Sequence, residues 1–142
     1  MTSAFTLEQA IDKIESSYEF MLAYAAQGRD FESTGGDGPP IRQVLNVLIL
    51  SLIALAPAFE KEIGKANAAR PEALNEFCRL VAVDAERALT AVNVVLSAHN
   101  IGSQLIDNLN ASMHLRTLLT DMFLLDEALS GASQTTPRRS DN

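Results

Sequence analysis

The sequence has no tryptophan, a single cysteine and few aromatic residues of any kind. Aromatic residues make up 6% of the chain whereas apolar residues make up 47%, so the core must be aliphatic, which favours helices over sheets. The lone Cys78 excludes an intramolecular disulfide, and nothing therefore requires an oxidising compartment. These absences predict an all-α protein with an aliphatic core.

Basic residues are also scarce, with 11 Lys and Arg against 18 Asp and Glu and a net charge of −7. Nucleic-acid binding needs clustered cations that neutralise phosphates, so we expect no nucleic-acid partner. The N-terminus shows no basic segment followed by an apolar one, as a secretory signal would. The cytoplasm is the expected location.

A length of 142 residues suits one domain. We expect a helical domain over residues 1–130 and a disordered tail over residues 131–142, which lacks apolar periodicity. The run from Gln43 to Phe59 has no charge, but it is shorter than a bilayer span and contains Asn46 and Pro57. It predicts a buried helix rather than a membrane contact.

Capping and breaking residues divide this domain into four expected helices. Thr6 and Gln9 fit a capping box before the first helix, and Pro71 suits the first position of the third. Pro57 is expected to kink or interrupt the second helix, and Gly102 marks a tight turn before the last. The expected ranges are about 7–27, 40–65, 71–98 and 103–129.

The third and fourth expected helices carry apolar stripes that mesh if the two helices are antiparallel. The register that matches them pairs Ala88 with Ser112 and Asp84 with Arg116. The prediction is therefore an antiparallel four-helix bundle. A second apolar stripe on the fourth helix, from Leu115 to Leu129, needs further cover, so we expect a homo-oligomer, a dimer or a tetramer.

The expected Asp84–Arg116 pair is the most informative polar feature, because charges inside a core must find a partner or a ligand. Ala88 and Ser112 form a small layer beside it, and Tyr18 of the first helix could close the space. The five residues predict a small polar ligand site. The alternative is a structural ion pair that fixes the register.

Motifs for catalysis, metal or cofactor binding are not evident. His99 and His114 lack the paired Glu-x-x-His sequences of di-iron bundles, so no metal or cofactor is expected. The segment around His99 resembles histidine phosphotransfer modules, although Ile101 precedes Gly102 where those modules usually carry Lys. Without a recognisable nucleophile–base pair, we do not expect an enzyme.

The segment from Tyr18 to Arg29, within a short acidic helical chain, resembles the EfgA-type formaldehyde sensors of methylotrophic bacteria. This resemblance implies a non-enzymatic oligomer that binds formaldehyde and restrains growth or translation, and it assigns no ligand residues. The alternative function is a protein-interaction adaptor or chaperone that takes a partner helix on an exposed stripe. A histidine phosphotransfer module is the third possibility.

Overall fold

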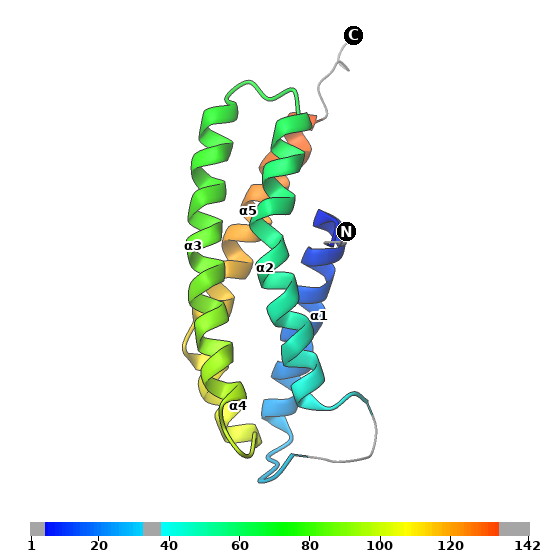
Figure 1. Cartoon of the computed structure of the whole chain (residues 1–142), viewed down its shortest axis with the longest axis vertical. Coiled ribbons are helices and arrows are strands. Elements are labelled where there is room, and N and C mark those ends of the chain that lie inside the picture. The colour runs from blue at the N-terminus through cyan, green and yellow to red at the C-terminus, as the bar shows by residue number, and fades with distance from the viewer. Residues whose placement is uncertain (1–4, 33–37, 134–142) are drawn as a thin grey trace.

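A computed structural model describes residues 5–32 and 38–133, which contain five helices and no strand (Figure 1). The all-α class is therefore confirmed for this part of the chain. The helices are α1 (Leu7–Ala26), α2 (Ile41–Lys65), α3 (Pro71–Leu96), α4 (Ser103–Ala111) and α5 (His114–Ser133).

The predicted start signals of α1 and α3 are confirmed. The Thr6 hydroxyl accepts a hydrogen bond from the Gln9 amide at 3.1 Å, and the Thr6 amide donates to the Gln9 side chain at 3.0 Å. Two orphan amides at the start of α1 are thereby satisfied. Pro71 is the first residue of α3, where its missing N–H costs no hydrogen bond.

The helix α2 continues through Pro57 without interruption, and a kink at this proline stays a prediction. By length and composition α2 could also cross a membrane, but the core helix of a globular protein meets the same criteria. One face of α2 is in fact buried among the other helices, including Leu48, Leu55 and Phe59, which are fully buried. The packing of this face agrees with the predicted core helix.

The prediction of one continuous helix over 103–129 is wrong, because α4 ends at Ala111 and α5 begins at His114. Met113 between them adopts a left-handed backbone, with φ of 71°. The Ser112 hydroxyl donates to the Leu109 carbonyl oxygen at 2.6 Å. Short polar side chains that bond the backbone in this way compete with helix continuation.

The helix α5 runs to Ser133, so the tail does not begin at residue 131 as predicted. The rest of the predicted disordered tail, residues 134–142, lies outside the described residues.

The break between α4 and α5 changes what each packs against. α1, α2 and α3 lie side by side in chain order, while α4 packs mainly on α1 and α5 mainly on α3 (Figure 1). α5 also turns a different face to the core. Its buried residues are Leu115, Leu118, Leu119, Met122, Leu125 and Leu129. The second apolar stripe, from Leu115 to Leu129, is thus covered within the chain and needs no second copy to bury it. Because this stripe faces the core, the predicted register between the last two helices is wrong.

We predict that Gly102→Ala destabilises the fold, because a Cβ there would lie 2.9 Å from the Asp30 carbonyl oxygen and 3.0 Å from that of Arg29. Backbone atoms must shift to admit it, so we expect a loss of about 1–3 kcal/mol in urea unfolding. Gly64→Ala in α2 is the matched control, because nothing lies within 4 Å of its Cβ. The control should gain up to about 1 kcal/mol in helix propensity; equal effects would contradict the close approach at Gly102.

Candidate functional site

The five residues of the predicted ligand site do not come together as expected. Asp84 and Ala88 are buried on α3, but Ser112 and Arg116 are exposed, and Tyr18 is half-buried on α1. The predicted Asp84–Arg116 ion pair is wrong: within the described ranges Asp84 pairs with Arg87, one turn along α3, at 3.5 Å. The left-handed residue Met113 is the reason, because it rotates α5 and carries Arg116 to the surface.

Asp121 of α5 takes the place that Arg116 was expected to fill. Its carboxyl group faces Asp84, and its Oδ2 atom is buried with no hydrogen-bond partner in the described structure. Burial raises the pKa of Asp121 to about 6, and Asp84 adds to this through its charge and through the hydrogen bond that the two carboxyls make only when one of them is protonated. Two carboxyls from different helices therefore share one proton below this pH and repel each other above it. We call Asp84 and Asp121 the carboxyl layer.

The sequence did carry a signal for Asp121, although it was missed. Asp121 lies between Leu118 and Leu125 of the second apolar stripe, which turned out to face the core. Once that stripe is taken as the buried one, Asp121 falls at its edge, opposite the polar position of α3. Of the predicted layers, only Asp84 and Ala88 of α3 are buried, and the residues predicted opposite them, Arg116 and Ser112, are exposed.

We predict that Asp121→Asn stabilises the protein at neutral pH. Above pH 6 the native pair has lost its shared proton, whereas the Asn amide donates to Asp84 at every pH. Between about pH 4 and 6 the folded protein holds a proton that the unfolded chain has released, so the stability of the native protein falls as the pH rises. The variant should gain about 1–2 kcal/mol at pH 7.5, a figure reduced for solvent screening.

Urea unfolding at pH 4.5 and 7.5 checks this prediction, and the advantage of Asp121→Asn should vanish at the lower pH. Asp107→Asn is the matched control, because Asp107 is exposed on α4. Surface changes of this kind shift stability by no more than about 0.5 kcal/mol. A gain that is the same at both pH values would contradict the shared proton.

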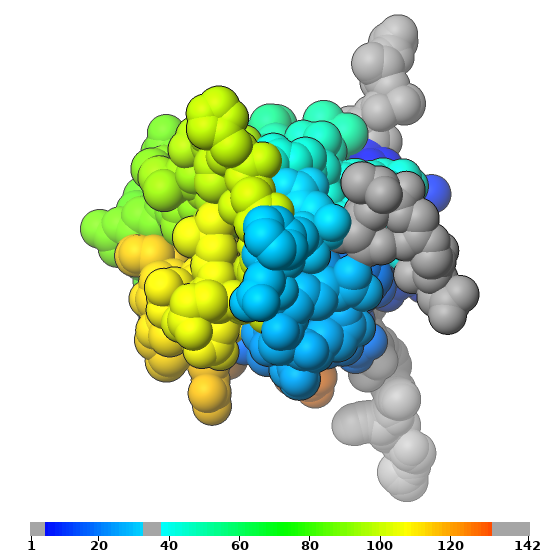
Figure 2. Space-filling model, turned by 90° about the horizontal axis from the view of Figure 1, so that it is seen from below, coloured from blue at the N-terminus to red at the C-terminus, as the bar shows by residue number. Residues whose placement is uncertain are grey.

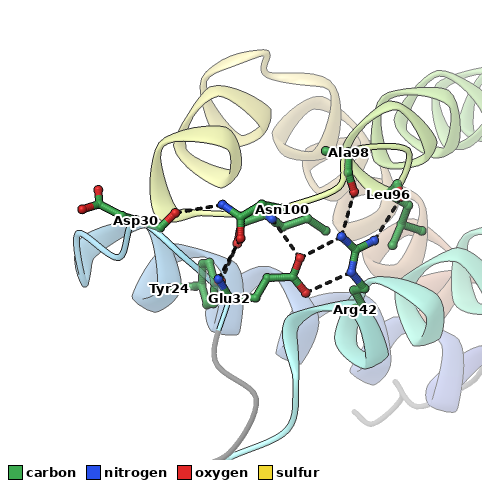
Figure 3. Close-up of polar contacts among 8 residues, drawn as sticks. Tyr24, Asp30, Glu32, Arg42, Leu96, Ala98 and Asn100 are labelled. Atoms are coloured by element: carbon green, nitrogen blue, oxygen red, sulfur yellow. Dashed lines mark hydrogen bonds and ion pairs between the residues drawn. The ribbon is translucent and has the colours of Figure 1, made fainter.

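A second polar cluster closes one end of the molecule around Arg42, near the start of α2 (Figure 3). Its guanidinium group donates to both carboxylate oxygens of Glu32, at 2.7 and 2.9 Å. It also donates to the carbonyl oxygens of Leu96 and Ala98, at 3.1 and 2.7 Å. Arg42 thus satisfies carbonyl groups at the end of α3.

The same cluster ties the loop after α1 to the turn before α4. Glu32 accepts from the Ile101 amide at 2.9 Å, and its own amide donates to Asn100 at 3.0 Å (Figure 3). The Tyr24 hydroxyl donates to the Ile101 carbonyl oxygen at 2.6 Å. The Ser103 hydroxyl donates to the backbone carbonyl oxygen of Tyr24 at 2.7 Å. Figure 2 shows these two segments side by side at this end, in blue and yellow. We call this cluster the clasp.

The clasp is a structural feature, because its members satisfy one another. Hydrogen bonding with Arg42, with the Ile101 amide adding to it, lowers the pKa of Glu32, so the ion pair persists at neutral pH. No pattern in the sequence singled out Glu32 as a functional or structural residue. Arg42 is ten residues away and the Ile101 amide is 69 residues away, so no local spacing indicates that the three groups meet.

The chain offers little for covalent chemistry in its described part. Cys78 is buried, its thiol donates to the Ala56 carbonyl oxygen at 3.5 Å, and burial raises its pKa. A thiol in this state is a poor nucleophile. Across the described ranges, His, Cys, Asp and Glu form no group of three or more that could hold a metal ion.

Comparisons with protein-family models, curated proteins and solved structures found no match. The function must therefore be inferred from the residues of this chain.

Proposed function

We propose that this chain is a non-enzymatic cytoplasmic sensor, a homo-oligomeric four-helix bundle that binds a small polar metabolite and restrains growth or translation. The observation that carries the proposal is the buried Asp121 Oδ2 atom, which has no donor in the described structure. An unpaired buried acceptor costs about 1–3 kcal/mol, which a ligand with a hydrogen-bond donor can recover. The carboxyl layer is the proposed site.

The chemistry of this layer favours a small ligand rich in donors. Ionised carboxylates only accept hydrogen bonds, so the ligand must supply hydroxyl or ammonium protons. Ala85 and Ala88 follow Asp84 along α3 and are buried, so two of the side chains beside it are short, while Arg87 pairs with it from the exposed side. Formaldehyde in water exists mainly as its hydrate, a one-carbon diol with two hydroxyl donors. It is the candidate metabolite, in agreement with the resemblance noted in the sequence.

We predict that formaldehyde binds the native protein and that Asp84→Asn and Asp121→Asn abolish this binding. Carbon-13-labelled formaldehyde, followed by NMR, separates the reversibly bound hydrate from covalent adducts. A ligand at 100 times its dissociation constant should add about 2.7 kcal/mol to the free energy of unfolding.

Matched controls for this experiment are Arg116→Ala and Ser112→Ala, which change exposed members of the originally predicted site. Both should bind formaldehyde like the native protein. Loss of binding in the controls, or normal binding when both carboxyl groups are amides, would contradict the proposed site.

The outer face of α2 supports the proposed oligomer. Leu50 and Ile53 are each 57% exposed there, within the run that carries no charge. A surface pocket of about 320 Å³ lies between α2 and α3, where Ile53, Ala82 and Leu89 line it together with Glu60 and Glu86. Adjoining exposed apolar residues of this kind commonly mark a protein interface, and in the proposed assembly a second copy covers them.

We predict that Leu50→Glu/Ile53→Glu converts the oligomer to a monomer, because charge on this face cannot be buried unpaired. Sedimentation velocity measures the change. Val94→Glu is the matched control, since Val94 is 64% exposed near the end of α3. An oligomer that survives the double substitution, or a native protein that is monomeric at all concentrations, would overturn this interface.

A further inference from the structure

The helices α1 and α5 border an open groove at the end of the molecule opposite the clasp. Its volume is about 830 Å³. We call it the α1/α5 groove. Its lining residues are Thr6, Leu7, Glu8, Ile11, Asp12, Glu15, Glu62, Phe123, Asp126, Leu129 and Ser130. The groove exists because α5 packs mainly on α3 and makes few contacts with α1.

Apolar side chains lie along both walls of this groove. Leu7 and Ile11 are one turn apart on α1, and Phe123 and Leu129 come from α5. The Phe123 side chain is 44% exposed, whereas Ile11 and Leu129 are buried at the base of the groove. The walls are thus two antiparallel helices with apolar residues spaced to meet a third helix.

The charged residues that line this groove are all acidic in the described structure. Of the five carboxylates, Glu62 pairs with Lys65 of the same helix at 3.4 Å, so Glu8, Asp12, Glu15 and Asp126 carry the negative charge that faces a ligand. Burial and neighbouring carboxylates, with Asp126 among them, raise the pKa of Glu15. Burial, with Glu127 adding to it, raises the pKa of Asp126. A cation placed between them would relieve this repulsion.

We infer that the α1/α5 groove binds an amphipathic helix of a partner protein, one with an apolar stripe flanked by Lys and Arg. Such a helix would place its stripe on the exposed Phe123 and its cations beside Glu8, Asp12 and Asp126. The inference goes beyond the proposed sensor function, since it concerns a different surface and does not require a metabolite. It supplies the output contact that a regulatory protein needs.

The test uses the full chain and a fluorescent synthetic helix of about five turns, with Leu at helical spacing and Lys and Arg on both flanks. Anisotropy titration should show saturable binding that weakens with salt. An analogue with Glu in place of each basic residue should not bind. Binding of the acidic analogue, or none of the basic one, would overturn the inference.

Paired variants localise the binding. Glu8→Lys/Asp126→Lys should weaken it at least tenfold, whereas Glu72→Lys/Glu76→Lys makes the same change of net charge on exposed positions of α3 and should have little effect. Phe123→Ala should likewise weaken peptide binding about tenfold, or by about 1.4 kcal/mol. Leu124→Ala should leave the affinity unchanged, because Leu124 is exposed but does not line the groove. Equal losses within either pair would mean non-specific attraction and overturn the inference.

Other occupants give different results. If spermine displaces the peptide and the Phe123→Ala protein binds it normally, the groove takes a small polycation. If Arg138→Glu/Arg139→Glu tightens peptide binding tenfold, the chain's own tail is the occupant. If Glu8→Lys/Asp126→Lys dissociates the oligomer, a second copy fills the groove. Each of these three results overturns the partner helix.

Discussion

The left-handed backbone of Met113 is the constraint on which the rest of the structure depends. It ends α4, turns α5 about its axis and determines that Leu118 and Leu125 enter the core. The same rotation brings Asp121 to Asp84 and leaves Arg116 in solvent. It also directs α5 towards α3, so that α1 loses a neighbour at one end and the α1/α5 groove opens. A single residue with positive φ thus bears on two of the proposed binding surfaces, the carboxyl layer and the α1/α5 groove.

The two ends of the molecule differ in how many of their charged side chains have hydrogen-bond or ion-pair partners. At the clasp, the Arg42 guanidinium and the Glu32 carboxylate bond each other and the free carbonyl and amide groups of the adjoining turns. At the opposite end, five carboxylates line the α1/α5 groove, and of these Glu62 pairs with Lys65 at 3.4 Å. Between the ends, Asp84 of the carboxyl layer pairs with Arg87 at 3.5 Å, whereas the buried Asp121 Oδ2 atom has no hydrogen-bond partner within the described residues.

The sequence predicted what depends on local patterns and missed what depends on distant contacts. The capping box at Thr6, the start of α3 at Pro71 and the helical class follow from neighbours a few residues apart. The register of the last two helices failed because an unbroken stripe was assumed across Ser112 and Met113, where no glycine or proline marks the break. Asp84 was correctly selected as a buried polar residue. Its partner could not be found, since one unrecognised turn moved every later residue.

The separation of α4 from α5 also has a consequence for the order of folding. α1, α2 and α3 form two successive helical hairpins with contacts between chain neighbours, and we expect such local contacts to form before those of α5. α5 must then dock on α3 without the support of a continuous helix from α4. Its amides should exchange with deuterium faster than those of α2, as a unit that opens while the remaining helices stay packed. A regulatory signal that reaches α5 would therefore act on the part of the fold that is least costly to move.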